Sequence, residues 1–192
     1  ERREYIQNKH NIDNEHCFES WEDLFSLPKF ADVALICSMD RLHCAHAVAA
    51  LKQGYDLLLE KPVAATAENC AKILKVAKET GRKVLVCHTM RYEPFWRTLK
   101  ALITEGKIGD IMSVEHIETV GPLLYTHAFV RGNWNNSETS SFMLLQKCSH
   151  DLDMLSWLMD EDCKRIHSFG SLTHFRRENA PEGSPERCIE GC

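Results

Sequence analysis

The sequence lacks both long apolar runs and any large basic patch. Its longest apolar stretches, such as 33–37 and 57–59, are far shorter than the ~20 residues that cross a bilayer as a helix. The net charge is −5, and hydrophobic and charged residues make up 44% and 27% of the chain, as is typical of a folded protein. We therefore expect a cytoplasmic protein that binds neither a membrane nor a nucleic acid.

Closely spaced cysteine pairs are lacking too. The nine cysteines are an odd number, lie scattered along the chain and form no C-x-x-C pair. This usage argues against a disulfide framework and fits a reducing compartment. Cys37 and Cys87 fall in apolar runs, where we expect small buried side chains. No metal site is predicted, because no Cys/His pair has ligand spacing, although Cys188 and Cys192 could open a cysteine cluster at the end of the chain.

The glycine fingerprint of a dinucleotide-binding turn is also missing. None of the nine glycines has the G-x-G-x-x-G spacing, and no glycine stands before Asp32. Either the fingerprint lies upstream of Glu1, or this domain never had one. The expected opening helix, Arg2–Lys9, has the pattern of the helix after a second strand, which favours the first option. Because Glu1 is not Met and the chain ends in a loop-like stretch, both ends are interpreted as cuts through a longer chain.

A strand–helix rhythm runs from residue 32 to residue 86. The strands are short and continuously apolar, as in a parallel sheet that is buried on both faces. The predicted strands are Asp32–Cys37, Asp56–Leu59 and Lys83–Cys87; the predicted helices are 43–53 before Gly54, 67–80 between Thr66 and Gly81, and 21–27 after a Ser20/Asp23 capping box. This order predicts an incomplete Rossmann-type doubly wound parallel sheet.

After residue 90 the rhythm changes. We expect helices over 94–105 and 144–159 and strands over Ile111–Thr119 and Arg165–Thr173. This pattern predicts the start of an α+β substrate and oligomerisation domain. With the boundary near Arg91, the chain divides into a partial dinucleotide-binding domain, 1–91, and a partial C-terminal domain, 92–192.

Two polar clusters follow predicted strands directly, where open α/β sheets bind their ligands. Glu60 and Lys61 follow the second strand and can face the ligand crevice, although a surface ion pair is an even alternative. Ser38 opens the turn after the first strand and could line a nucleotide. His43 ends that turn and could cap a helix or contact a ligand, but an ordinary strand-to-helix turn is the favoured interpretation.

The third cluster lies on the predicted helix 144–159. At 100° per residue one stripe is apolar and is expected to pack: Leu144, Cys148, Leu152, Leu155 and Met159. Another side presents Lys147, His150 and Asp153, so an imidazole that titrates near neutrality has a carboxylate that could orient it. A solvated polar face is at least as good an interpretation.

The tryptophans divide into two groups. Trp21, Trp96 and Trp157 lie on amphipathic helices and are expected in the core. Trp134 lies in a loop-like stretch before the polar helix, where a sugar ring could stack on it.

Together these segments resemble the Gfo/Idh/MocA dehydrogenases. The resemblance covers nearly the whole chain and rests on these segments: Ala31–Ser38, His43, Ala49–Gly54, Leu59–Pro62, His88–Phe95, Glu105–Asp110 and the H-D-x-D of His150–Asp153. It implies an NAD- or NADP-dependent oxidoreductase that acts on a CH–OH group of a sugar, polyol or related small molecule. It also implies a homo-oligomer when the chain is full length.

The resemblance implies roles for particular residues. Lys61 would bind the reacting hydroxyl, and His150 or Lys147 would exchange its proton. Beyond these roles, we expect Trp134 and Asp153 to contact the substrate and these residues to contact the cofactor: Ser38, Asp40, His43, Glu60, Lys61 and Arg91. Family members often have an aspartate four residues before the histidine; here Gln146 stands there, and glutamine cannot take a proton. A non-catalytic, ligand-binding family member is therefore the alternative, and the motifs leave the substrate, the choice of NAD or NADP and the direction open.

Overall fold

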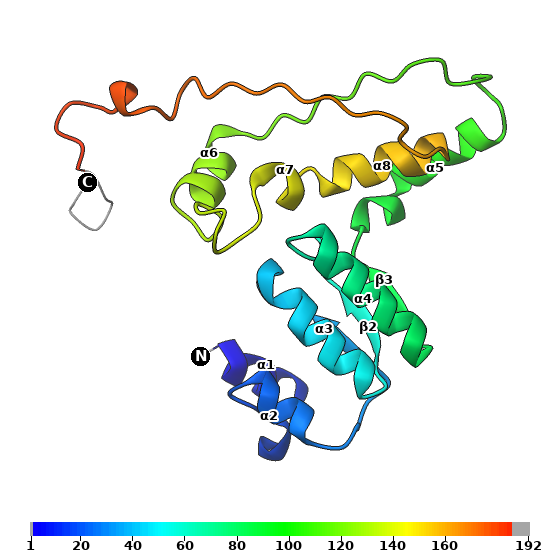
Figure 1. Ribbon diagram of the computed structural model, residues 1–192, viewed down its shortest axis with the longest axis vertical. Helices are drawn as coiled ribbons and strands as arrows, with labels where there is room; N and C mark the ends of the chain where they lie inside the picture. Colours follow the sequence, from blue (N-terminus) through cyan, green and yellow to red (C-terminus); the bar gives the residue numbers. More distant parts are fainter. Residues whose placement is uncertain (1, 186–192) are drawn as a thin grey trace.

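The computed structural model describes residues 2–185 and contains a three-stranded parallel sheet (Figure 1). The strands are β1 (Val33–Ile36), β2 (Asp56–Leu59) and β3 (Val84–Val86), in the order β1-β2-β3. Leu58 of β2 pairs with Leu35 on one side and Leu85 on the other. All three predicted strands are confirmed, each within a residue of its predicted ends, and so is the incomplete Rossmann-type sheet.

Helices α3 (His43–Lys52) and α4 (Ala67–Thr80) connect the strands. The hydroxyl of Thr66 accepts a hydrogen bond from the backbone N–H of Asn69 at 3.2 Å, which satisfies one of the unpaired donors at the start of α4. Gly81 ends α4 with φ = +64°, a left-handed conformation that favours glycine. The core lies between these helices and the sheet: Ile36, Ala47, Leu51, Leu57, Leu59, Ile73 and Val76.

The N-terminal segment folds into α1 (Arg2–His10), the 3₁₀ turn η1 (Asn14–His16) and α2 (Trp21–Ser26). Ser20 caps α2, because its hydroxyl accepts from the N–H of Asp23 at 3.1 Å. The half-buried ring of Trp21 packs on His46 of α3, with 4.8 Å between ring centroids. This segment therefore covers the first helix of the sheet domain.

One face of the sheet is uncovered, so the prediction of strands buried on both faces is wrong. Leu35 is 65% exposed and Leu85 54% exposed, whereas Leu57 and Leu59 on the other face are buried. Successive side chains of a strand point to opposite faces, and α3 packs on only one of them. Cys37 continues the exposed row of Leu35, so its predicted burial is also wrong, while Cys87 is half-buried.

The second part of the chain is mostly helical where it is regular. Its elements are η3 (Thr89–Tyr92), α5 (Pro94–Thr104), α6 (Pro122–Tyr125), the π-helical turn η4 (Thr126–Val130), α7 (Met143–Gln146), α8 (Ser149–Met159) and η5 (Arg177–Asn179). In the sheet part, the short 3₁₀ turn η2 (Asp40–Leu42) lies between β1 and α3. Figure 1 shows α5 beside α8, where the ammonium of Lys100 donates to the carbonyl of Leu158 at 3.4 Å. None of the helices in residues 2–185 is both long enough and apolar enough to span a membrane.

The two strands predicted beyond residue 91 are wrong. Residues 111–119 and 165–173 run as extended segments without regular structure (Figure 1). A strand is stabilised by its ladder of backbone hydrogen bonds, and within residues 2–185 neither segment has such a partner. Their apolar side chains stay in solvent: Met112 is 90% exposed and Phe169 98% exposed.

The predicted helix 144–159 is two helices, and its predicted packing face is wrong. A turn at Lys147 and Cys148 interrupts the helix and separates α7 from α8. The expected stripe residues Leu152 and Met159 are exposed, whereas Asp151 is 6% and Met154 1% exposed. The buried side of α8 therefore carries a carboxylate, which the hydrophobic pattern alone does not predict.

Candidate active site

The carboxyl ends of the three strands bring the predicted polar residues together. Ser38 follows β1, Lys61 follows β2 and His88 follows β3. Because parallel strands end at the same edge of a sheet, these residues come to one edge, the place where open α/β sheets bind ligands and called the crevice below. Lys61 and His88 contact Gln146 of α7 and Asp153 of α8 there, whereas the hydroxyl of Ser38 lies 2.9 Å from Nδ1 of His46.

Lys61 joins the two parts of the chain. Its ammonium donates to the backbone carbonyl of Gln146, at the end of α7, over 2.6 Å. Burial lowers the pKa of Lys61, and Lys147 lowers it further, while Glu60 and Asp40 raise it. The contact uses the main chain of residue 146, so it does not depend on a carboxylate at that position.

His150 lies on α8 close enough to Lys61 for their charges to interact. Burial lowers its pKa most; Lys61, His88 and Lys147 lower it further, and Asp151 raises it. These effects favour the neutral imidazole, the form that can accept a proton near neutral pH. Its Nδ1 is buried without a hydrogen-bond partner among residues 2–185.

Neither aspartate of the H-D-x-D motif orients His150, so that hypothesis is wrong. The carboxylate of Asp153 accepts two hydrogen bonds from Arg91, from Nε at 2.7 Å and from Nη2 at 2.6 Å. The carboxylate of Asp151 accepts from Nε2 of His116 at 2.7 Å. The guanidinium of Arg91 also stacks on Trp157, 5.7 Å from its ring centroid, and so holds η3 against α8.

Asp40 fastens a distant loop to the turn after β1. Its buried Oδ2 accepts from the indole N–H of Trp134 at 3.3 Å and from the backbone N–H of Ser141 at 3.0 Å. Arg41 adds a hydrogen bond to the carbonyl of Ser137. The loop 131–141 is thereby attached beside the crevice, which places Trp134 near the predicted substrate site.

His43 has no ring nitrogen left for a ligand. Its side chain is 1% exposed, with Nδ1 2.8 Å from the carbonyl oxygen of Pro62 and Nε2 3.0 Å from that of Ser38. The imidazole thus connects the turn after β1 with the turn after β2, which favours the structural interpretation over a cofactor contact. Cofactor contacts by Ser38, Asp40, Glu60 and Arg91 stay predictions.

Two features were missed by the sequence reasoning. His88, which the sequence indicated only as part of a family motif, is the second residue after β3, as Lys61 is the second residue after β2, and that position is the signal that could have found it. Lys147, predicted as a proton donor, forms an ion pair with Glu118, 3.0 Å apart.

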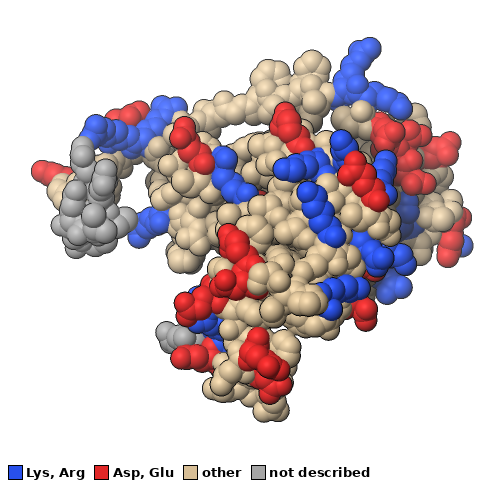
Figure 2. Space-filling view, turned by 60° about the horizontal axis from the view of Figure 1, so that its bottom comes forward, with Lys and Arg blue, Asp and Glu red and all other residues tan. Residues whose placement is uncertain are grey.

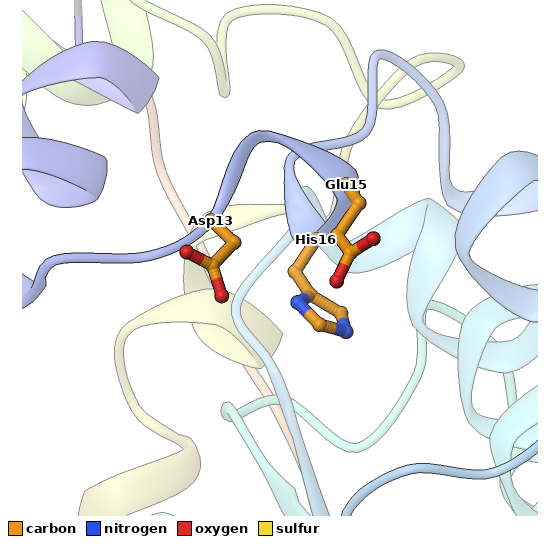
Figure 3. A group of neighbouring side chains, drawn as sticks. All are labelled: Asp13, Glu15 and His16. Carbon is orange, nitrogen blue, oxygen red and sulfur yellow. The ribbon is translucent and has the colours of Figure 1, made fainter.

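The second missed feature is a group of possible metal ligands outside the crevice. Asp13, Glu15 and His16 place one ligand atom each within 4.8 Å of one another, at η1 between α1 and α2 (Figure 3). All three are exposed, as acidic surface groups commonly are. They contribute nothing to the crevice, and the predicted cluster at Cys188 and Cys192 lies outside the described residues.

The parallel sheet and the crevice at its carboxyl edge define a Rossmann-type dinucleotide-binding fold. Two family models agree with this class: one described as an oxidoreductase family with an NAD-binding Rossmann fold matches residues 1–88, and the GFO/IDH/MocA C-terminal domain matches residues 96–184. The chain belongs to the Gfo/Idh/MocA oxidoreductase family, as the sequence motifs predicted. The domain boundary at Arg91 stays a prediction.

Individual relatives extend the comparison. The chain is 26% identical to the putative oxidoreductase YteT of Bacillus subtilis, over 88% of this chain and 42% of that protein. It is 30% identical to an inositol 2-dehydrogenase of Pseudomonas syringae, over 68% of this chain and 36% of that protein. The chain spans less than half the length of these relatives.

Solved structures show the same fold. The WlbA dehydrogenase of Bordetella pertussis, in complex with NADH and UDP-GlcNAcA, matches with a TM-score of 0.64 and 25% identity, over 81% of this chain and 44% of that one. The myo-inositol 2-dehydrogenase of Lactobacillus plantarum matches with a TM-score of 0.68 and 18% identity, over 83% and 45%.

Proposed function

We propose that this chain forms the nicotinamide-facing part of an NAD(P)-dependent dehydrogenase that acts on the CH–OH group of a polyol or sugar. The observation that carries the proposal is the convergence of Lys61 and His150, from two separate parts of the chain, at the carboxyl edge of the sheet. The names of the relatives support the substrate class, since they include inositol dehydrogenases. The proposal covers both NAD and NADP as the cofactor.

Lys61 is the group that holds the reacting oxygen. Its ammonium sits at the ligand edge, and its present acceptor is a carbonyl that a substrate hydroxyl could replace or share. A cation beside that oxygen stabilises the negative charge that develops as the hydroxyl loses its proton. The lowered pKa of Lys61 brings it closer to neutral pH, where it can also assist proton transfer.

His150 is the group that exchanges the proton. In oxidation the hydroxyl proton moves to its neutral imidazole, and in reduction the imidazolium returns it. The buried Nδ1 of His150 without a partner is a polar atom that this chain leaves available beside Lys61. Lys147 is the less suitable donor, because Glu118 already pairs with its ammonium.

The residues at the crevice fit the nicotinamide end of a dinucleotide. Glu60, Lys61 and Ser38 offer polar side chains along the strand ends, and a bound nicotinamide would accept or supply the hydride. The glycine-rich turn that binds a pyrophosphate is not among the 192 residues, so this chain by itself supplies only part of such a site.

The alternative is a family member that binds a ligand without catalysis. Gln146 favours it, because an aspartate-to-histidine pair cannot form there and Nδ1 of His150 lacks a partner in the described residues. The contact of Lys61 with the backbone of residue 146 argues for retained catalysis, since it needs no particular side chain.

The experiment uses the protein encoded by the gene that contains this sequence. Turnover is followed as NADH or NADPH formation with myo-inositol and a panel of sugars, and cofactor binding by fluorescence titration. We expect Lys61→Ala to lower kcat by about 100-fold or more, the usual range for a lost acid–base group, with little change in cofactor affinity. Lys72→Ala, on the exposed side of α4, is the matched control and should leave kcat unchanged.

Either of two results would contradict the proposal. Unchanged turnover of Lys61→Ala would remove the assigned role of that residue. No turnover of the wild-type protein with any substrate, while it still binds the cofactor, would favour the non-catalytic alternative.

A further inference from the structure

His88 and His150 form a pair of imidazoles inside the crevice. Their ring centroids lie 6.1 Å apart, with the ring planes at 71°. His88 comes from the end of β3 and His150 from α8, so the pair spans the two parts of the chain. The proposed function uses only His150, which leaves a second titratable ring beside it without a role.

The charges around the two rings differ. At His150 the positive groups Lys61, His88 and Lys147 oppose protonation, and the favourable effect of Asp151 on its pKa is the smallest. At His88 burial lowers the pKa most, but the largest effect of a charge is that of Asp153, which raises it; Arg91 and Lys61 lower it less. Among the charges, a carboxylate thus has the largest effect at His88, whereas positive groups have the largest effects at His150.

The two rings also differ in their access to solvent and to a counter-charge. Nδ1 of His150 is buried and has no partner among residues 2–185. Nδ1 of His88 lies 3.0 Å from Oδ1 of Asp153, and the side chain of His88 is 24% exposed. In the part of the chain that the structure describes, no carboxylate forms a hydrogen bond with His150, whereas a proton on His88 has the carboxylate of Asp153 beside it and solvent within reach.

We propose that His88 is a proton-relay residue, which receives the substrate's proton from His150 and releases it to solvent. The inference rests on the proposed function. In oxidation the substrate O–H bond breaks as an N–H bond forms on His150, while a bound nicotinamide would take up the carbinol hydride with its two electrons. No hydrogen bond joins the two rings within the described residues, so a water molecule between them takes the proton of His150 as it gives one of its own to His88. Asp153 balances the charge of the new imidazolium. Release of that proton to solvent returns both rings to the neutral form.

The order of protonation tests the relay without any turnover. In the protein free of cofactor and substrate, ¹⁵N NMR of the imidazoles should show His88 taking up its proton at a higher pH than His150. Asp153→Asn should move the protonation of His88 to lower pH, because the carboxylate that favours the imidazolium is lost. Protonation of His150 before His88 would overturn the proposal.

Kinetics tests the relay under turnover, with myo-inositol and NAD as the probe. We expect His88→Gln to lower kcat by about tenfold, less than loss of the acid–base group itself, with KM and cofactor affinity within about twofold. Added imidazole should restore part of the lost kcat, which a merely structural role would not allow. His116→Gln is the matched control: that ring also contacts an aspartate of α8, at 2.7 Å, and its side chain is 26% exposed.

Failure of the relay and failure of the proposed function give different results. If Lys61→Ala and His150→Gln lose turnover while His88→Gln keeps the wild-type kcat and solvent isotope effect, the relay is wrong and the dehydrogenase stands. If the wild-type protein oxidises no polyol or sugar, the proposed function itself fails, and with it the relay.

Discussion

Three histidines are held toward their neutral form by the fold. The pKa values of His46, His88 and His150 are all lowered, and burial is the largest cause for each. Burial disfavours the charged ring, and positive neighbours act in the same direction. Two of the three, His88 and His150, lie in the proposed active site. The fold therefore favours neutral imidazoles at the place where the proposed reaction needs them.

This arrangement predicts a loss of stability in mild acid. The unfolded chain binds protons at the ordinary histidine pKa, about 6.5, and the folded chain binds them only at lower pH. The contribution of these histidines to the free energy of unfolding is therefore complete above about pH 6.5. It is lost as the pH falls through their lowered pKa values in the folded protein. Urea unfolding at pH 7.5 and pH 5.5 should show a lower midpoint at pH 5.5, and His46→Asn should reduce the difference. An equal or higher midpoint at pH 5.5 would contradict the assignment.

At the residue scale, the sequence predicted contacts between neighbours in the chain but not contacts between distant residues. The caps Ser20 and Thr66 act as predicted, because a capping oxygen needs only its own backbone a few residues ahead. The pairing of Asp153 with Arg91 was not predictable, since the two residues are 62 positions apart and meet only after folding. The same distance in sequence hid the closeness of His88 and His150.

At the scale of elements, the loop 131–141 depends on one glycine. It follows the π-helical turn η4 and carries Trp134, whose backbone N–H donates to the carbonyl of Ala128 at 3.2 Å. A Cβ at Gly132 would overlap the carbonyl oxygen of His127 and lie 3.0 Å from that of Ala128. The chain can make this close approach only where the residue has no side chain.

Gly132→Ala should therefore destabilise the loop. We expect a loss of about 1–3 kcal/mol in the free energy of unfolding, the usual cost of forcing atoms into a filled space. Gly121→Ala is the control, because apart from its chain neighbours no atom of residues 2–185 lies within 4 Å of the added Cβ, and its φ is negative, −59°. Urea midpoints of both variants measure the effect. Equal midpoints for the two variants would be incompatible with this close approach.

At the scale of the whole molecule, the two parts of the chain differ in how they are held. The sheet part has a buried core between β1–β3 and the helices α3 and α4. The extended segments 111–121 and 161–173 instead leave large apolar side chains in solvent: Met112, Val114, Ile117, Ile166, Phe169 and Leu172. Apolar side chains exposed over this length favour association, as the homo-oligomer implied by the sequence resemblance would require. The homo-oligomer stays a prediction.

The charged side chains are spread over the surface of the molecule, whereas the exposed apolar side chains named above lie along two segments. On the face drawn in Figure 2, basic and acidic side chains are interspersed over much of the surface. This is consistent with the expectation that the protein does not bind nucleic acid, which stays a prediction, as does the cytoplasmic location.

The difference between the hydrogen-bonded sheet and the exposed extended segments predicts two different rates of backbone hydrogen exchange. Backbone amides of β2, which is hydrogen-bonded on both sides, should be the most protected, and amides of 111–120 and 161–173 should exchange fastest, because in the described structure they join no ladder. Mass spectrometry of exchanged peptides measures this directly. Strong protection in 111–120 at low protein concentration would mean that this segment forms a strand after all. Protection that grows with concentration would indicate pairing between copies.

The sequence by itself determined the sheet, its helices, their caps and the family. It did so because strand and helix periods, capping residues and the motif around Lys61 are local, and βα units repeat them in a fixed order. Only the tertiary structure decided which side of α8 is buried, which residues accept the hydrogen bonds of Arg91 and Lys61, and that His88 stands beside His150. Those outcomes depend on contacts between residues far apart in the chain, where burial of a few side chains overrides the local pattern. The predicted strands beyond residue 91 failed for the same reason: a strand exists only with its partner, and within the described residues no partner lies beside them.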